Sequence, residues 1–478
     1  MRKAPAPAAL LAALCLPGCM MLGPDYAGPP ETVPPAAPFV RAGPADGAPP
    51  ALASWWEGLG DPLLDRLVGR ALAGNADIAA TRARTRAALA VLAARRADLF
   101  PRAGAQGLYL HGHLSDVDFG AIRDGAGGSE DFDYYSLGFN ASWEVDLFGR
   151  QRRGAEAALA RAEAAQASLA DARLGLSAEL VRTYADLRDR QRRLALARET
   201  LALRQQALDL MRQRHDQGTA TELDIERQRM RIEEPRARIA RLEAETAALL
   251  DALAVLSGTV PGTLDAELAP PRPAPLPPAV VTVDNPAALL RRRPDIRAAE
   301  RTLAADTAAI GVAAAERFPK VTLLGSLGVG GTDLSSLSRL DDLSLFALPR
   351  IEWTFLDFGR AGAMLAQAEA RRDETEARYR GVVLAALRDA EDALARFHAS
   401  RTRIAGFART LAAAERSVVL LRQREQGGTA SRLQLIDAED QRVSAAETLS
   451  GAEADLTRDY AALQKALGLG WEDQEKGP

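Results

Sequence analysis

Apolar and polar residues follow two different periods along this chain, and each change of period marks a predicted element. From Tyr135 to Asp146 apolar and polar residues alternate one by one, as in a β-strand with one apolar face and one polar face. Weaker versions of this alternation follow Pro101 and occupy Val321–Val329 and Arg350–Phe355. Each segment is about ten residues long, which is the length of a tilted transmembrane β-strand.

Elsewhere the pattern takes the period of an α-helix and continues for an unusual length. No proline interrupts the Ala-, Leu-, Arg- and Glu-rich runs at 150–215 and 360–426, and at 1.5 Å per residue each run reaches roughly 100 Å. Helices this long need a coiled-coil-like partner, and abundant alanine lets neighbouring helices approach closely. Shorter return helices are predicted at 221–256 and 431–467. Pro235 predicts a kink in the first of them, because proline removes a backbone hydrogen bond.

The two halves of the chain repeat one plan. Asp77-Ile78 and Phe100-Pro101 recur 218 positions later, as Asp295-Ile296 and Phe318-Pro319. Further on the separation is 210 positions: Trp143, Phe148-Gly149-Arg150 and Gly218-Thr219-Ala220 recur as Trp353, Phe358-Gly359-Arg360 and Gly428-Thr429-Ala430. Ordered matches with one change of spacing, which falls in a loop, indicate an internal duplication. Each half reads helix, two strands, very long helix, turn and return helix.

The first residues have the composition of a secretory leader. Arg2 and Lys3 precede an apolar run and then small residues, which is typical of a signal peptide. Cys19 follows Leu16-Pro17-Gly18, a context that resembles a bacterial lipobox, so we expect its thiol to be acylated; the alternative is an ordinary cleavage region that contains a cysteine. Several acyl chains would anchor the chain lastingly. Cys15 leaves with the leader, so no internal disulfide is expected.

These patterns divide the chain into six parts. They are a signal peptide at 1–18, a lipid anchor and extended segment at 19–58, repeat 1 at 59–258, a proline-rich linker at 259–285, repeat 2 at 286–468 and a tail at 469–478. Within the repeats the strands are expected at about 102–146 and about 320–357.

Four strands cannot close a membrane barrel on their own. No run after residue 18 approaches the ~20 apolar residues of a spanning helix, so the chain can cross a membrane only as β-strands. Known membrane barrels start at about eight strands, and each unpaired backbone group at an open edge costs several kcal/mol in lipid. The monomer is therefore expected to associate, and strand number alone allows two copies or three. A soluble sandwich is the alternative, but no second sheet is predicted to cover the apolar face.

Several motifs, in this order, resemble the TolC/OprM family of outer-membrane efflux factors. They are Gly23-Pro24-Asp25-Tyr26 after Cys19, Trp55-Trp56 before Asp61-Pro62, the two Phe-Pro helix ends, and Arg293-Pro294-Asp295-Ile296. Within the family the chain is most similar to the lipidated branch that includes NodT-type proteins. The resemblance implies an α+β fold, in which a long coiled-coil-like α-helical barrel joins four transmembrane β-strands per chain, closed as a 12-stranded β-barrel in a homotrimer.

The resemblance also implies a function and partners. The chain would be the outer-membrane channel of a tripartite efflux pump, anchored to outer-membrane lipid through Cys19 and extending into the periplasm. Its partners would be a periplasmic adaptor (membrane fusion) protein and an inner-membrane pump of the resistance-nodulation-division (RND) type. Such channels hold no cofactor and do no chemistry. A net charge of −4 with 26% charged residues gives no indication of nucleic acid.

By the same resemblance, the periplasmic tip lies at the two turns between long and return helices. The adaptor contacts would be Gly218, Thr219, Ala220, Gly428, Thr429 and Ala430. The alternative role of both glycines is to end a helix, because glycine adopts positive φ without strain. The two roles are compatible.

A periplasmic gate is expected just past the second turn. Leu433 and Asp437 match the constriction positions of family members, and Asp224 is expected to occupy the matching site of the first turn region. Three copies of Asp437 would form an acidic ring that attracts cations. The alternative is that these carboxylates are solvated charges on a helix face. Gln434, Asp440 and Ala430 depart from the family's pattern, so its locking bonds cannot be transferred.

Other motifs carry little functional weight. The glycines between Gly325 and Gly331 have the wrong spacing for a phosphate loop, and His111 and His113 lack an evident third metal ligand. No Ser/His/Asp or Cys/His set emerges, so the chain is not expected to be an enzyme. Two rival functions stay open: a type I secretion exit duct of the same fold, and a lipid-anchored periplasmic coiled-coil scaffold, which leaves the strands without a role.

Overall fold

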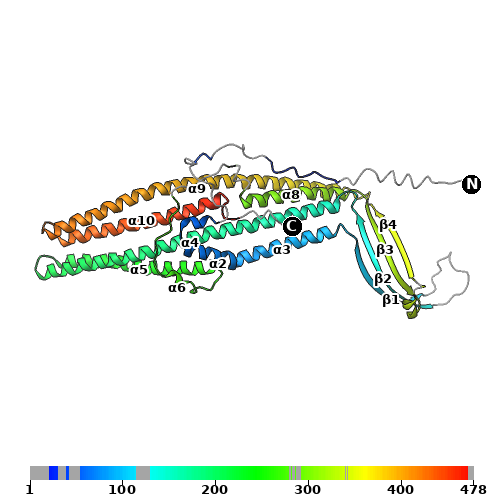
Figure 1. The fold of residues 1–478 in the computed structure, drawn as a ribbon, viewed down its shortest axis with the longest axis horizontal. Helices are drawn as coiled ribbons and strands as arrows, with labels where there is room; N and C mark the ends of the chain where they lie inside the picture. Colours follow the sequence, from blue (N-terminus) through cyan, green and yellow to red (C-terminus); the bar gives the residue numbers. More distant parts are fainter. Residues whose placement is uncertain are drawn as a thin grey trace, which may run out of the picture. The chain divides into compact units, whose positions relative to one another are not determined.

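The computed structural model describes residues 21–30, 39–41, 54–114, 130–278, 281, 286, 292–339, 341 and 343–471 (Figure 1). The predicted leader and Cys19 lie outside the described residues. The chain forms two compact units, each built from three stretches of sequence. The first unit lies within 1–29, 86–164 and 300–378, and the second within 30–85, 165–299 and 379–478.

Each half of the chain contributes helices, two strands, a very long helix and a return helix. The main elements are η1 (Trp55–Leu59), α2 (Pro62–Gly74), α3 (Ala76–Ala97), β1 (Arg102–Leu114), β2 (Glu130–Val145), α4 (Arg150–Asp216), α5 (Glu222–Leu256), α6 (Asp265–Leu268), α8 (Pro294–Ala315), β3 (Lys320–Gly331), η2 (Leu334–Ser338), β4 (Leu343–Glu352), α9 (Arg360–Gln426) and α10 (Arg432–Ala466). Long helices and a four-stranded sheet in the described part of the chain confirm the predicted fold class. Among the described residues, no helix is both long enough and apolar enough to span a membrane.

The lengths of the long helices repeat between the two halves. The helices α4 and α9 have 67 residues each, and α5 and α10 have 35 each. The helix α5 includes Pro235, which is buried. The indole of Trp143 donates to the carbonyl of Leu99 at 3.0 Å, and that of Trp353 donates to the carbonyl of Arg317 at 3.2 Å. These two bonds join residues that the shifts of 210 and 218 positions make equivalent, so the duplication extends to tertiary contacts.

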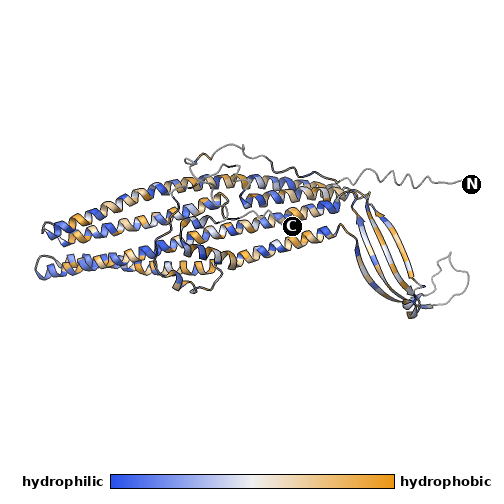
Figure 2. Ribbon diagram, viewed as in Figure 1, coloured by the Kyte–Doolittle hydropathy of each residue, from blue (hydrophilic) through white to orange (hydrophobic). Residues whose placement is uncertain are grey.

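The four strands form one antiparallel sheet in the order β1-β2-β3-β4. Its pairing places Phe139 beside Leu327, which lies beside Leu345 on the next strand. One face is therefore apolar, and these side chains remain open to the surroundings: Phe139 is 65% exposed and Leu345 is 77% exposed. Figure 2 shows hydrophobic residues along the strands. The other face carries Ser136, Asn140 and Glu144, as their alternation with the apolar residues predicts.

The leucines of β1 lie on the polar face. The register pairs Leu108 with Ser136, whereas Tyr109 pairs with Tyr135 on the apolar face. Alternation along one strand identifies two faces, but only the partner strand decides which face joins which. The apolar face of β1 therefore consists of its small residues near Arg102, followed by Tyr109 and two histidines.

The largest hydrophobic core belongs to the second unit. Leu63, Leu64 and Leu67 of α2 are fully buried against residues of α4, α9 and α10. The carboxylate of Asp61 accepts a hydrogen bond of 2.9 Å from the amide of Leu63 and so caps α2. Trp55 and Trp56 are buried in the same core.

The inter-repeat linker is tied to α4 by a buried arginine. The guanidinium of Arg188 is 1% exposed and donates to the carbonyls of Leu268 at 3.1 Å and Pro270 at 2.9 Å. Its second nitrogen donates to the hydroxyl of Tyr184 at 3.0 Å. A charged donor buried this fully needs several acceptors, and the linker supplies two of them.

Candidate functional site

The two turns between long and return helices share one backbone geometry. Gly218 has a φ of 71° and Gly428 a φ of 72°. The amide of Thr219 donates to the carbonyl of Arg214, and that of Thr429 donates to the carbonyl of Arg424, both at 2.8 Å. With the glycine amide bonded three residues back, each turn is a Schellman motif. Both glycines therefore end their helices, and their role as docking residues stays a prediction.

The return helices also begin alike, through capping boxes. The hydroxyl of Thr221 accepts from the amide of Asp224, whose carboxylate accepts from the amide of Thr221 at 3.0 Å. The equivalent pair at the start of α10 is Ser431 and Gln434. The hydroxyl and amide of Thr221 hold the pKa of Asp224 below its ordinary value. The predicted roles of Asp224 did not include this cap, although Thr-x-x-Asp before an apolar run is a local signal of a capping box.

The two predicted gate residues of α10 differ in burial. Leu433 is half-buried and packs against two apolar clusters, one with Leu203 and Ile436 and one with Leu208 and Ile225. Asp437 is exposed. By the shift of 210 positions, Asp437 corresponds to Arg227, and Asp224 corresponds to Gln434. Asp224 and Asp437 are thus not equivalent positions of the two hairpins.

Asp440, one turn further along α10, forms an ion pair with Arg204 of α4. Burial raises the pKa of Asp440; Arg204 opposes this shift and Asp437 adds to it. The two partners lie 236 positions apart, and no local pattern in the sequence links them. The ion pair fixes α10 against α4 close to the tip.

A small polar cavity adjoins this ion pair. It has a volume of about 190 Å³, and Pro235 lies in its wall. The charged residues that line it are Arg204, Arg231, Arg238, Glu234, Asp440 and Glu447. Arg238 of α5 contacts Glu447 of α10 at 2.6 Å. At this cavity α4, α5 and α10 thus meet through charged residues, in addition to the apolar cluster that they share.

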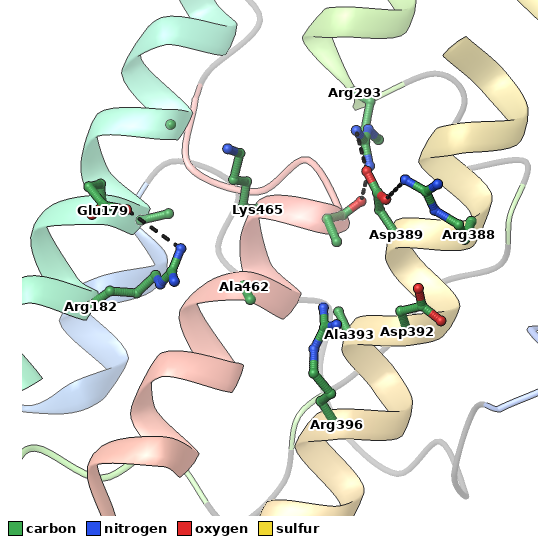
Figure 3. Close-up of a pocket in the computed structure, with 13 residues that line it drawn as sticks. Glu179, Arg182, Arg293, Arg388, Asp389, Asp392, Ala393, Arg396, Ala462 and Lys465 are labelled. Carbon is green, nitrogen blue, oxygen red and sulfur yellow. Dashed lines mark hydrogen bonds and ion pairs between the residues drawn. The ribbon is translucent and has the colours of Figure 1, made fainter. Parts of the chain in front are cut away.

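A larger cavity of about 490 Å³ lies between α4, α9, α10 and the residue that precedes α8 (Figure 3). Its charged lining comprises the cations Arg182, Arg293, Arg388, Arg396 and Lys465 and the acids Glu179, Asp389 and Asp392. Asp389 lies 2.9 Å from Arg388 and 3.9 Å from Arg293, and Arg182 lies 3.5 Å from Glu179. Figure 3 shows Lys465 extending between α10 and α4. The lining is mostly charged, so the wall of this cavity is polar.

The segment that follows Cys19 is held against the first unit. Arg153 of α4, 1% exposed, donates to the carbonyls of Leu22 at 3.0 Å and Gly23 at 3.1 Å. The amide of Leu22 donates to the carbonyl of Phe148 at 3.2 Å. A Cβ on Gly23 would come within 2.5 Å of the backbone of Gly311, so only glycine fits this approach.

The remaining candidates lie in the strands of the sheet. His111 lies 3.0 Å from Asp133 and His113 lies 2.6 Å from Asp131, across one strand pair. Within the part of the chain that the structure describes, no cluster of three or more ligand residues could hold a metal ion. The glycine run lies in β3, where a Cβ on Gly328 would come within 2.8 Å of the carbonyl of Leu137. These glycines permit close strand approach.

Comparison with known proteins gives consistent matches over nearly the whole chain. The family model described as outer membrane efflux protein matches residues 67–259 and 285–469. The outer membrane protein OprJ of Pseudomonas aeruginosa is 33% identical over 478 residues, which are 97% of this chain and 96% of OprJ. Nodulation protein T of Rhizobium leguminosarum bv. trifolii is 30% identical over 461 residues, 96% of each chain. The solved structure of the outer-membrane channel OprN superposes with a TM-score of 0.85 at 34% identity, over 94% of this chain and 99% of that one.

Proposed function

The chain belongs to the outer membrane efflux protein family, and from this premise we propose that it is the outer-membrane exit duct of a tripartite efflux pump. Its cargo would be drugs or other small molecules. The observation that carries the proposal is a four-stranded sheet with an exposed apolar face, continued by helices of 67 residues. An apolar outer face suits lipid, and a polar inner face suits a water-filled passage.

The duct requires more than one copy of the chain. In the described sheet, β1 and β4 are edges whose outer backbone groups have no strand to pair with. Three copies supply twelve strands, which close into a barrel wide enough to hold water. The homotrimer removes every open edge from the lipid, where each unpaired group costs several kcal/mol.

The partners follow from the two ends of the chain. An acylated Cys19 would anchor the duct in outer-membrane lipid, and the bonds from Arg153 to Leu22 and Gly23 would hold the anchor segment against the wall. At the other end, the adaptor protein would contact the turns at Gly218–Ala220 and Gly428–Ala430, and an RND-type pump would load the duct. Matching φ angles at the two turns give a trimer six nearly equivalent docking positions.

The gate would lie about one to two turns beyond these contacts, at Leu433 and Asp437, with Asp224 supporting the first hairpin through its capping box. Arg227 corresponds to Asp437 in the other repeat. Three copies would therefore place three Asp437 and three Arg227 side chains alternately around the axis. The variant Asp437→Ala should raise single-channel conductance in planar bilayers and weaken block by multivalent cations. Unchanged current traces would refute the gate while leaving the duct intact.

A deletion strain tests the function as a whole. Loss of the chain should lower the inhibitory concentration of several antibiotics, dyes or solvents, and the full-length gene should restore it. The purified protein should be trimeric by light scattering in detergent and should resist alkaline extraction from membranes. A monomer that alkali releases would overturn the proposal. Restored secretion of one protein, without any change in drug susceptibility, would instead indicate a type I secretion duct.

A further inference from the structure

Part of the sheet face that would line the proposed passage is apolar. This is the face that carries Ser136, and successive residues of a strand point to opposite faces. The register pairs Leu108 with Ser136 and Leu110 with Tyr134, so both leucines lie on this face. They are 52% and 46% exposed. A wall that serves only to hold water gains nothing from exposed leucines, because apolar surface in contact with water is unfavourable.

A second apolar strip lies on the same face at the opposite edge of the sheet. Phe346 pairs with Ser326, which pairs with Asn140, and Leu348 lies two residues further along β4. Phe346 is 55% exposed and Leu348 is 53% exposed. Each strip lies four to eight residues from the helix-side end of its strand. Because β1 and β4 are the edges of the sheet, the strips of neighbouring copies would lie side by side in the proposed trimer.

Between the two strips this face is formed mainly by glycine and serine. Gly138 pairs with Gly328, and a Cβ on either residue would come within 2.8 Å of the other strand's backbone. A Cβ on Gly330 would meet the hydroxyl of Tyr134 at 3.0 Å, so the tyrosine side chain leans across β3. The wall between the strips is therefore low, and an aromatic ring can lie flat against it.

Among the side chains that the structure describes, the charged ones of this face lie near the helix-side ends of the strands. One of them is Arg102, at the start of β1. Glu144 pairs in register with Thr322 and through it with Arg350. Between these ends and the level of Phe132, no residue on this face is charged. A surface without charges offers no ion pair to a charged solute, so it favours an uncharged, apolar one.

Resting on the duct proposed above, we propose that this part of the passage binds uncharged aromatic solutes. The binding surface is the lumen patch, which consists of Leu108 and Leu110 of one copy together with Phe346 and Leu348 of the next. Cargo is the occupant because a passage of this kind admits water and cargo, and an aromatic ring that covers the patch removes two apolar surfaces from water. The patch is open on one side, so binding is weak and reversible, as passage requires.

Single cysteines in the full-length chain, in its membrane, test which way the lumen patch faces. Leu345 and Phe346 are neighbours on opposite faces of the sheet, and Leu345 lies on the apolar face, which would be the outer one. A charged thiol reagent that does not cross lipid should modify Phe346→Cys and spare Leu345→Cys, which lipid would cover. The parent protein, in which acylation would block Cys19, serves as the blank.

Protection by a probe tests the binding itself. Aqueous 1-naphthol, an uncharged aromatic compound, should slow the modification of Phe346→Cys and of Leu110→Cys saturably, by about fivefold. Naphthalene-1-sulfonate, its anionic analogue, should protect much less. The matched control on the same face is Thr322→Cys, at the charged end of the sheet, whose modification rate 1-naphthol should leave unchanged. Phe346→Ser should abolish the protection of Leu110→Cys, whereas Phe346→Tyr, which keeps the ring, should preserve it.

The other outcomes separate the lumen patch from the proposed function. An unreactive Phe346→Cys in an intact trimer would mean that protein covers the patch, so that its side chains pack the copies together and bind no cargo. Equal slowing of Thr322→Cys, or equal protection by the sulfonate, would refute a site for uncharged rings and leave the duct intact. If Leu345→Cys reacts and Phe346→Cys does not, the sheet faces the other way, and the proposed duct fails together with the patch.

Discussion

Replacing Arg153 by methionine should release the segment at 21–30 that follows Cys19 while leaving the long helices intact. Methionine retains most of the side-chain length and favours helix, so α4 should persist. The change removes the bonds to the carbonyls of Leu22 and Gly23 at 3.0 and 3.1 Å. The amide of Leu22, which donates to the carbonyl of Phe148, reports directly whether the segment is bound.

The structure sets the size of the effect. A hydrogen bond from a charged group contributes about 1.5 kcal/mol or more, so the two carbonyl bonds together hold the segment by about 3 kcal/mol. The ion pair with Asp25 adds little, because that side chain is 89% exposed and water screens it. Since about 1.4 kcal/mol corresponds to a factor of ten, the open population should rise roughly 100-fold.

Hydrogen exchange of the amides at 21–30 measures this opening, with exchange in the middle of α4 as the internal reference. The matched control is Arg152→Met, because Arg152 contacts Asp146 rather than the anchor segment. We expect the amide of Leu22 to exchange about 100-fold faster in the Arg153 variant only. An exchange rate within threefold of the parent protein would refute the inference that Arg153 holds this segment.

Three further changes probe the tip. Reversing one charge at the proposed ring, by Arg227→Asp or Asp437→Arg, should disturb bilayer conductance more than the double exchange; equal effects of the single and double variants would contradict an alternating ring. Hydrogen bonds from Thr221 lower the pKa of Asp224 from its ordinary value of 3.8. The capping box is therefore intact above pH 3.8 and is lost as the pH falls through the lowered pKa. Exchange protection at the start of α5 should therefore fall in acid in the parent and stay flat in Asp224→Asn. Gly428→Ala should cost about 1–2 kcal/mol and loosen the turn in hydrogen exchange, because alanine is strained at positive φ, whereas Gly427→Ala should be neutral.

Periodicity predicted most of the secondary structure because both kinds of element are long. The two helices of 67 residues and a strand such as β2 repeat their apolar period often enough to be distinguished from a chance pattern. The helix ends were predictable for a different reason, since glycine at Gly218 and Gly428 is the residue that a left-handed turn requires. Local chemistry therefore determined where the elements begin and end.

Pairing between distant segments could not be predicted in the same way. The register between β1 and β2 decides on which face of the sheet Leu108 lies. The alternation of apolar and polar residues along β1 does not determine this register. The ion pair between Arg204 and Asp440 joins residues 236 positions apart. Nor does any local pattern distinguish Phe358 from Phe148, although only Phe358 has a positive φ. In each case the partner segment, rather than the residue's own neighbours in sequence, determines the outcome.

The duplication has kept backbone geometry and changed charge, and the distinction has a physical reason. In the proposed trimer both repeats would supply the same share of one closed wall, so the helix lengths, strand registers and glycine turns have to agree. Side chains at the helical turns and at the edges of the sheet would be under no such constraint, because one repeat would meet its neighbour within the chain and the other would meet it in another copy. Arg227 against Asp437, and Glu144 against Thr354, are differences of this kind. In the proposed trimer, equivalent positions that carry unlike charges would therefore be the ones that contact another copy.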